Sequence, residues 1–208
     1  MKSLSSRAKC LILFFLILIA DQAVKFWIKT HMTIGQDIPV CGQWFIIRFI
    51  ENNGMAFGFE LGGSIGKFLL SLFRIAAVGL IGWYIHYLLK MKARTGFVLA
   101  CTLVFAGAIG NIIDSMFYGL VFDQSTFSHV ASFLPEGGGY AGFLKGKVVD
   151  MLYFPIIKGT IPPWFPFSAG EEFIFFRPIF NLADSAITVG VFIILLFYRH
   201  TFAEHLKD

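Results

Sequence analysis

Ionisable side chains inside long apolar stretches are the residues of this sequence that could do chemistry. Asp114 and Asp184 stand out, because each lies near one end of a hydrophobic stretch long enough to cross a membrane. A charged residue in the middle of a membrane span costs roughly 2.5–3.5 kcal/mol on insertion scales, and less toward the interface. Aspartate is too short to reach water from far inside a span, so these two carboxylates are candidates for a functional site.

Other polar residues fall at matching positions in four apolar stretches. They are Asp21 and Lys25 in the first stretch, Lys67 and Arg74 in the second, Asn111 and Asp114 in the third, and Asn181 and Asp184 in the fourth. If successive stretches alternate in direction, all eight lie in the outer third of their helices, which predicts a shared polar site. Paired structural charges would give the same pattern. At their i,i+4 spacing, Asp21 and Lys25 are predicted to form such a pair.

Two carboxylates that face one site could carry out acid–base catalysis. Burial and mutual repulsion raise one pKa, so that the pair shares a proton near neutral pH. The ionised member can take a proton from an attacking water, and the neutral member can donate one to a developing oxyanion. The five histidines are scattered and show no metal-ligand spacing. We therefore expect neither a metal nor an organic cofactor.

The elements that position these residues are predicted to be membrane helices. The chain has 208 residues, of which 57% are hydrophobic and only 14% charged. No basic stripe with interleaved aromatic residues is present, so nucleic-acid binding is not expected. The first stretch begins like a signal peptide but has no small-x-small cleavage site, and we interpret it as an uncleaved span. Four spans are predicted near residues 9–29, 66–89, 96–118 and 178–199.

The basic residues at the span ends predict the orientation. With four spans they all fall on one side of the membrane, where only Glu204 and Asp208 accompany them. By the positive-inside rule that side is cytoplasmic, and both termini are expected there. Segments 30–65 and 119–177 would then face outward. The basic residues at these span ends are Lys2, Arg7, Lys9, Lys90, Lys92, Arg94, Arg199 and Lys207.

The outer segments are predicted to be structured rather than simple linkers. Residues 44–50 are aromatic and β-branched, which favours a strand at the membrane surface. Segment 119–177 is expected to be a long loop, with a flexible joint at Gly137–Gly139 and no regular structure in "IPPWFPF". The predicted fold class is an all-α membrane protein with four transmembrane helices, a small β element and a long loop. Residues 1–208 would form a single integral-membrane domain.

Five short motifs carry a resemblance to a known family. In order they are "DQAVK" (21–25), "NNGMAF" (52–57), "GNIID" (110–114), "VVD" (148–150) and "FNLADS" (180–185). Each is weak alone, but together, in this order and on four predicted spans, they resemble the motif set of the lipoprotein signal peptidase (signal peptidase II) family. The resemblance implies an aspartic endopeptidase of the bacterial inner membrane with its active site near the periplasmic face. The expected substrate is a diacylglyceryl-modified prolipoprotein, cut just before the lipidated cysteine.

The resemblance also implies roles for individual residues. Asp150 and Asp184 match the two catalytic aspartates. The expected substrate-binding or supporting residues are Asn52, Gly54, Ala56, Phe57, Asn111, Asp114, Asn181, Ala183, Asp21 and Lys25. Membrane lipids are expected partners, and we expect a monomer.

The sequence departs from the family pattern at two places. The family usually has arginine after the position of Asp114, whereas this chain has Ser115, so that role is vacant or is filled by another residue such as Arg74. The first catalytic aspartate could also be Asp123, which follows the third span more closely. We prefer Asp150, because "GKVVD" matches the motif better than "GLVFD".

Two other function classes remain open at this point. A proton-coupled transporter or channel would also place carboxylates inside a helix bundle, although more often at the midplane and with repeat symmetry. A purely structural membrane protein would pair its acids with Lys25, Lys67 and Arg74.

Overall fold

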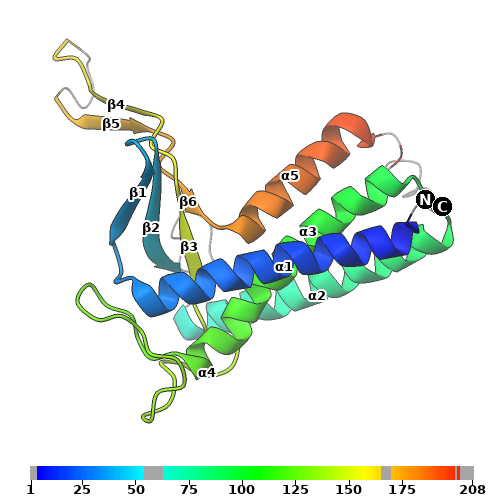
Figure 1. The fold of residues 1–208 in the computed structure, drawn as a ribbon, viewed down its shortest axis with the longest axis horizontal. Coiled ribbons are helices and arrows are strands. Elements are labelled where there is room, and N and C mark those ends of the chain that lie inside the picture. Colours follow the sequence, from blue (N-terminus) through cyan, green and yellow to red (C-terminus); the bar gives the residue numbers. More distant parts are fainter. Residues whose placement is uncertain (1–3, 54–62, 165–169, 200, 202–208) are drawn as a thin grey trace.

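Four long helices pack beside one another, and a β-sheet lies across one end of the bundle (Figure 1). The computed structural model describes residues 4–53, 63–164, 170–199 and 201. The start of α1 and the connection from α2 to α3 lie at the end opposite the sheet (Figure 1). Asp21 and Asp114 lie where the sheet meets the helices, because they accept hydrogen bonds from the backbone N–H groups of Ala183 and Val149.

The predicted spans correspond to helices in the structure. Three of the described helices are long and apolar enough to cross a membrane. The third is continuous through a π-helical turn, η2, and a short last turn, α4. The helices are α1 (Ser6–His31), α2 (Gly63–Lys90), α3 (Thr95–Ile113), η2 (Asp114–Tyr118), α4 (Gly119–Val121) and α5 (Leu182–Phe197).

The predicted fourth span, 178–199, is too long at its beginning. Residues Ile179–Phe180 form a strand, and Asn181 caps the helix that begins at Leu182. The resulting α5 has 16 residues, shorter than the three helices that meet the length of a span. The cap is the physical reason, because the Asn181 side chain accepts a hydrogen bond from the backbone of Asp184 and so fixes the first turn.

The chain has more β structure than the predicted all-α fold with one small β element, because segments 30–65 and 119–177 contribute strands to two sheets. The expected strand near 44–50 is present as β2, but the segment expected to be a long loop contributes β3, β4 and β5. The larger sheet is antiparallel in the order β1-β2-β3-β6, and β4 pairs with β5 in a separate hairpin. The strands are β1 (Asp37–Cys41), β2 (Phe45–Asn52), β3 (Val148–Tyr153), β4 (Ile157–Thr160), β5 (Glu172–Phe175) and β6 (Ile179–Phe180).

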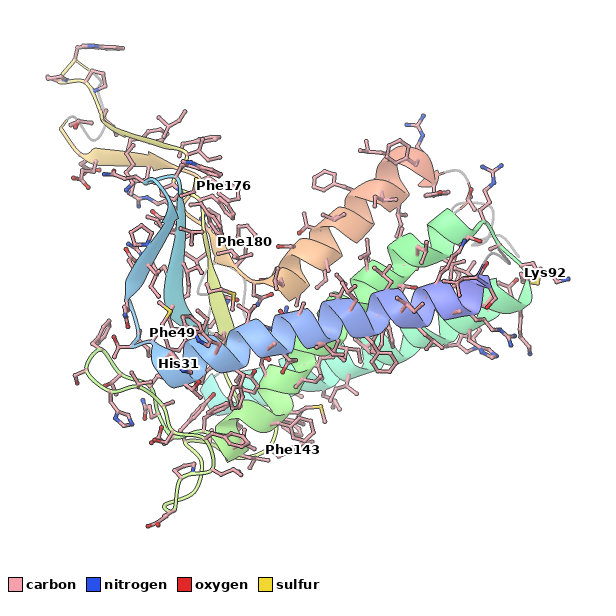
Figure 2. The ribbon with its side chains drawn as sticks, in the orientation of Figure 1. His31, Phe49, Lys92, Phe143, Phe176 and Phe180 are labelled. Carbon is pink, nitrogen blue, oxygen red and sulfur yellow. The ribbon has the colours of Figure 1, made fainter. Side chains whose placement is uncertain are left out.

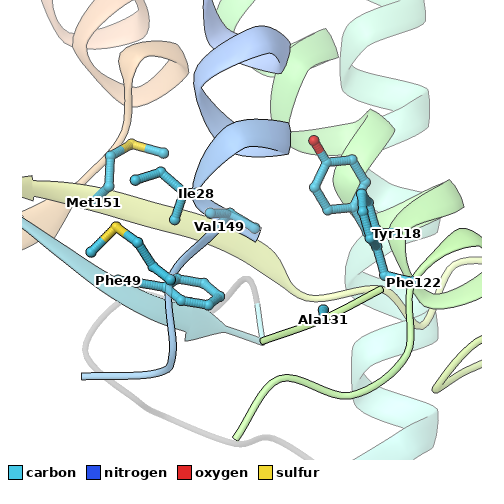
Figure 3. Packing of buried hydrophobic residues seen from close by; sticks show 8 residues of the cluster. Ile28, Phe49, Tyr118, Phe122, Ala131, Val149 and Met151 are labelled. Carbon is cyan, nitrogen blue, oxygen red and sulfur yellow. The ribbon is translucent and has the colours of Figure 1, made fainter. Parts of the chain in front are cut away.

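A buried apolar cluster fixes the sheet to the end of the bundle (Figure 3). Phe49 of β2 and Val149 of β3 are fully buried, and the cluster joins them to Ile28 of α1 and Phe122 after α4. Each large apolar side chain buried in this way contributes roughly 1.5–3 kcal/mol. Because Val149 belongs to the cluster, the position of the following residue, Asp150, is set by the packing.

Of the glycines at 137–139, Gly139 is more closely packed than expected of a flexible joint. An added Cβ at Gly139 would lie 2.1 Å from the carbonyl oxygen of Gly119 and 2.4 Å from that of Leu120. Gly137 and Gly138 have open space around them. The following residue, Tyr140, donates its backbone N–H to the carbonyl of Phe122 at 2.9 Å. Close backbone packing therefore accounts for glycine at 139.

A buried ion-pair cluster also connects the sheet to the helices. The ammonium of Lys29, fully buried at the end of α1, pairs with Glu51 of β2 and donates to the hydroxyl of Ser125 at 2.8 Å. Lys147 pairs with the other oxygen of Glu51 at 3.1 Å. The Lys29 ammonium also lies 4.8 Å from the ring centroid of Tyr140. The cluster therefore joins α1, β2 and the segment between α4 and β3.

Replacing Glu51 by glutamine should destabilise the fold strongly, because Lys29 would keep a buried charge without its carboxylate. We expect unfolding to become easier by roughly 3–5 kcal/mol. Thermal unfolding of the detergent-solubilised protein would measure the change. Asp37→Asn is a matched control, since the Asp37–Arg48 pair is 35% exposed on both sides and should contribute at most about 1 kcal/mol. Equal shifts in the two variants would contradict this account.

Candidate active site

Lys25 forms the centre of a buried polar network between three helices. Its ammonium donates to Asp21 at 2.9 Å, to Asp114 at 2.8 Å and to the side-chain oxygen of Asn111 at 2.9 Å. Lys25, Asp21 and Asp114 are at most 1% exposed. The predicted Asp21–Lys25 pair is therefore present, and Asp114 joins it. With all three ammonium protons used, the buried charge is well compensated.

The two acids of this network each hold a neighbouring element in place. The second oxygen of Asp21 accepts the backbone N–H of Ala183 at 2.9 Å, in the first turn of α5. Asp114 accepts the backbone N–H of Val149 at 3.3 Å, in β3. The network thus fixes the residue immediately before Asp184 and the residue immediately before Asp150.

Gln22 belongs to the network but was not given a role from the sequence. Its amide donates to Asp21 at 3.1 Å, to Asp114 at 2.9 Å and to the carbonyl of Gly110 at 3.2 Å. Its side-chain oxygen accepts from the hydroxyl of Tyr118 at 3.3 Å. The sequence feature that could have indicated this role is an amide beside Asp21 inside a membrane span, because burying an unpaired amide is energetically costly.

Asn181 connects the two candidate catalytic aspartates. Its side-chain oxygen accepts the backbone N–H of Asp184 at 2.8 Å, and Asp184 accepts the backbone N–H of Asn181 at 3.3 Å, which completes a capping box. The Asn181 amide donates to Asp150 at 2.7 Å. Asn181 is fully buried. One side chain therefore sets the start of α5 and brings β3 against it.

Asp184 lies in the first turn of α5, where a negative charge is favoured by the helix dipole. The amide of Asn111 donates to its other oxygen at 2.8 Å. The oxygen of Asn111 accepts from Lys25 and also from Asn181 at 3.1 Å. Asn111 therefore connects Asp184 to the Lys25 network.

Asp150 lies on β3 and is almost completely buried, with 2% of its surface exposed. Asn181 donates to one of its oxygens and Asn52 of β2 to the other, at 3.3 Å. Burial, followed by the charge of Asp184, raises the pKa of Asp150 to about 7. A carboxyl group with this pKa is available in both protonation states near neutral pH.

Asp123 has different surroundings from Asp150. Its carboxylate accepts the backbone N–H of Ser132 at 2.7 Å and lies 3.1 Å from the imidazole of His129, with 29% of the side chain exposed. Both contacts lie within its own loop. Of the other predicted site residues, Gly54, Ala56 and Phe57 lie outside the described residues.

A groove of about 430 Å³ opens beside Asp184. Phe176 and Phe180 line it from the strand side, and Ser185, Thr188 and Val189 line it from α5. Among the described residues, no group of three or more histidine, cysteine, aspartate or glutamate side chains could hold a metal ion. This region offers two carboxylates joined by amides, and one of them, Asp184, borders an apolar groove.

Comparison with known proteins agrees with this arrangement. Residues 13–199 match the family model described as Signal peptidase (SPase) II, which covers most of the chain. The chain belongs to the signal peptidase II family. It is therefore a peptidase by family, and its apolar helices make it a multi-pass membrane protein.

Relatives and solved structures extend this result. The lipoprotein signal peptidase of Porphyromonas gingivalis is 48% identical over 190 residues, which cover 91% of this chain and 82% of that protein. That of Amoebophilus asiaticus is 36% identical over 185 residues, with 87% and 73% covered. Two solved bacterial membrane enzyme structures superpose with TM-scores of 0.57 and 0.56 at 26% and 25% identity. The first covers 91% of both chains, and the second covers 93% of this chain and 90% of its own.

Ser115, where the resemblance led us to expect an arginine, lies in the π-helical turn η2. Ser115 is buried, and its hydroxyl donates to the carbonyl of Asn111 at 3.1 Å. Gly146 packs on the same turn, where its N–H donates to the Ser115 carbonyl at 2.9 Å and an added Cβ would lie 2.1 Å from the carbonyl oxygen of Asp114. The segment before β3 therefore covers this position closely.

Arg74 of α2 is the cation that the sequence offered in place of the missing arginine. It is partly buried and lies close enough to Asp184 and Asp150 to interact electrostatically with both carboxylates. A positive charge there favours an ionised carboxylate over two neutral ones.

The raised pKa of Asp150 should make the stability of the fold depend on pH. The folded chain keeps this proton up to about pH 7, whereas an unfolded aspartate loses it near pH 3.9. The native state therefore binds more protons, and stability should fall as the pH rises from about 4 to about 7. In Asp150→Asn the decline should be smaller, and above about pH 7 the variant should be at least as stable as the wild type. Melting temperatures across this range would test it.

Asp123→Asn is the control for this measurement, because its exposed side chain does not share the buried environment of Asp150. It should keep the wild-type decline. An unchanged decline in Asp150→Asn would contradict the assignment of a titrating buried carboxyl group to Asp150.

Proposed function

We propose that this chain is an aspartic endopeptidase that removes the signal peptide from diacylglyceryl-modified prolipoproteins by cutting before the lipidated cysteine. Asp150 and Asp184 are the proposed catalytic pair. The observation that carries the proposal is the contact of Asn181 with both of them, to the carboxylate of Asp150 and to the backbone of Asp184. Membership of the signal peptidase II family and the relatives named lipoprotein signal peptidase support the choice of substrate.

The contacts favour different protonation states for the two aspartates. Asp184 accepts hydrogen bonds from the amide of Asn111 and the backbone of Asn181 in the first turn of a helix, which favours its ionised form. Asp150 is more deeply buried, and its pKa is raised to about 7 by burial and by the charge of Asp184. We therefore assign the base to Asp184 and the acid to Asp150.

The reaction follows from these assignments. Asp184 takes a proton from water as the water oxygen forms a bond to the scissile carbonyl carbon, while Asp150 donates its proton to the carbonyl oxygen. In the resulting intermediate Asp184 is neutral and Asp150 is charged. Asp184 then gives its proton to the leaving nitrogen as the carbon–nitrogen bond breaks. Asp150 recovers its proton from the hydroxyl that becomes the new carboxyl group, so the pair returns to its starting state.

The position of Asp150 and Asp184 along the helices suits a substrate that consists of a peptide with attached acyl chains. The pair lies where the sheet meets the helices, and Asp184 is beside a groove lined by Phe176, Phe180 and α5. We propose that this end of the molecule is at the periplasmic face of a bacterial inner membrane, with four spans and cytoplasmic termini. The acyl chains could then stay among lipids while the peptide bond reaches Asp150 and Asp184.

The other two function classes fit the geometry less well. A structural role explains Lys25, which pairs with Asp21 and Asp114. It does not explain why Asn181 links Asp150 to the helix turn of Asp184, beside an apolar groove. A transporter would more often place its carboxylates near the membrane midplane, whereas here they lie at the sheet end of the helices.

Asp150→Asn and Asp184→Asn should each lower cleavage of a diacylglyceryl-modified prolipoprotein by roughly 10²–10⁴-fold, since each removes a proton donor or acceptor. Asp123→Asn should retain cleavage, because its side chain makes contacts within its own loop. The assay would use purified protein in detergent or lipid, with melting temperatures recorded in parallel.

The three variants separate the remaining interpretations. Cleavage that survives at Asp150→Asn but not at Asp123→Asn would show that Asp123 is the catalytic residue. Cleavage that survives in all three would exclude an aspartic mechanism. Loss of folding together with loss of cleavage at Asp184→Asn would favour a structural role.

Arg74→Gln should reduce cleavage at neutral pH by roughly tenfold, because removing the nearby positive charge makes the ionised carboxylate harder to form. The acid side of the pH–rate profile should shift to higher pH. Arg74→Lys, which keeps the charge, should remain close to the wild type. An unshifted profile in Arg74→Gln would show that this cation does not act on the pair.

A further inference from the structure

The β4–β5 hairpin has one apolar and one polar face. In its register Ile157 is opposite Phe175 and Gly159 is opposite Phe173, while Lys158 and Thr160 are opposite Ile174 and Glu172. Residues directly opposite each other share a face, and successive residues alternate between faces. Ile157, Phe173 and Phe175 therefore form one face. Lys158, Thr160, Ile174 and Glu172 form the other.

The apolar face is open in the structure. The exposed fractions of Ile157, Phe173 and Phe175 are 57%, 46% and 52%, whereas Ile174 on the other face is half-buried. An isolated two-stranded hairpin is at best marginally stable in water, and exposed apolar patches generally mark interaction sites. A partner surface that covers these three side chains would stabilise the hairpin.

The hairpin projects from the edge of the sheet on the side of α5, away from the helix bundle (Figure 1). Phe176, directly after β5, contacts Phe180 with ring centroids 6.1 Å apart, and Phe180 contacts Phe154 at 5.8 Å (Figure 2). Phe176 and Phe180 also line the groove beside Asp184. The base of the hairpin is therefore one wall of that groove.

The apolar surface continues from this groove along α5. Val189 lies in the groove wall and is 50% exposed, and Phe192 and Leu196 follow it at helical spacing with 58% and 68% exposed. In a multi-pass membrane protein such an exposed apolar helix face is in contact with lipid. The base of the hairpin, through Phe176, and the lipid-facing side of α5, through Val189, thus border the same groove.

We propose that the apolar face of the β4–β5 hairpin, formed by Ile157, Phe173 and Phe175, binds the lipid surface beside α5, at the boundary between headgroups and acyl chains. The groove that the hairpin base shares with the lipid-facing side of α5 identifies the partner. Trp164, four residues beyond β4 and 79% exposed, fits the same location, because tryptophan is enriched at membrane interfaces. Lipid contact at the hairpin would hold one wall of the groove level with the membrane surface.

Spin labelling can test which face of the hairpin contacts lipid. Single cysteines at Phe175 or Phe173, and at Lys158 or Thr160 as controls on the opposite face, would be introduced after Cys10, Cys41 and Cys101 are replaced. The full chain would be labelled with a nitroxide in phosphatidylcholine–phosphatidylglycerol nanodiscs. Collision rates with oxygen, which concentrates in lipid, and with a water-soluble nickel chelate would be measured. We expect the oxygen-to-nickel ratio to be several-fold higher at 173 and 175 than at 158 and 160.

Each alternative result has a defined meaning. Equal access of the nickel chelate to both faces would place the hairpin in water and overturn the proposal. Protection of Phe175→Cys from both reagents only after a lipidated peptide is added would show that this face binds substrate instead. Because the readout is accessibility rather than cleavage, it does not depend on the proposed function.

A second measurement needs no label. Quenching of Trp164 by lipids brominated near the headgroup can be isolated as the difference between the wild type and Trp164→Phe. The pair of changes Phe173→Ser and Phe175→Ser should reduce this quenching several-fold, whereas Lys158→Ser with Thr160→Ala should not. Equal quenching in both double variants would contradict lipid binding through the apolar face.

Discussion

The ammonium of Lys25 is the interaction on which the candidate site depends. It is fully buried and binds Asp21, Asp114 and Asn111, so that residues from α1, α3 and η2 share one positive charge. Each partner makes a further contact outside its own helix, to the first turn of α5, to β3 or to Asp184. A charge buried far from water is stable only when such contacts are complete. One buried cation therefore connects the contacts that reach α5, β3 and Asp184.

The proposed catalytic pair is divided between two kinds of element. Asp150 is on β3, which is held in place because Val149 packs with Phe49 in the apolar cluster. Asp184 is in the first turn of α5, which is held in place by its cap. Asn181 serves both, because its oxygen completes the helix cap while its amide reaches the strand. The same side chain thus caps α5 and holds Asp150 close to the helix turn of Asp184. Few other residues could replace Asn181 without losing one of these two contacts.

Much of the site could be predicted from sequence, because polar residues in membrane spans are rare and need partners. The i,i+4 spacing was sufficient for the Asp21–Lys25 pair, whereas the contact of Asn181 with Asp184 is a helix cap that the predicted span 178–199 did not include. The sheet was harder, since β6 has two residues and β3 is a short apolar run without a distinctive period. The role of Gln22 could not be predicted, because it depends on Asp114 and Tyr118, which are distant in the chain.

The position of Asp184 in the last described helix has a consequence for biosynthesis. Asp21, Lys25 and Asp114 enter the growing chain early, and Asp150 follows, but Asn181 and Asp184 are synthesised after all of them. The first turn of α5 supplies the N–H that Asp21 accepts, and Asn181 supplies the amide that reaches Asp150. A chain still emerging from the ribosome therefore contains only half of the carboxylate pair. In the proposed mechanism the carboxylate pair is complete only once α5 has packed against its neighbours.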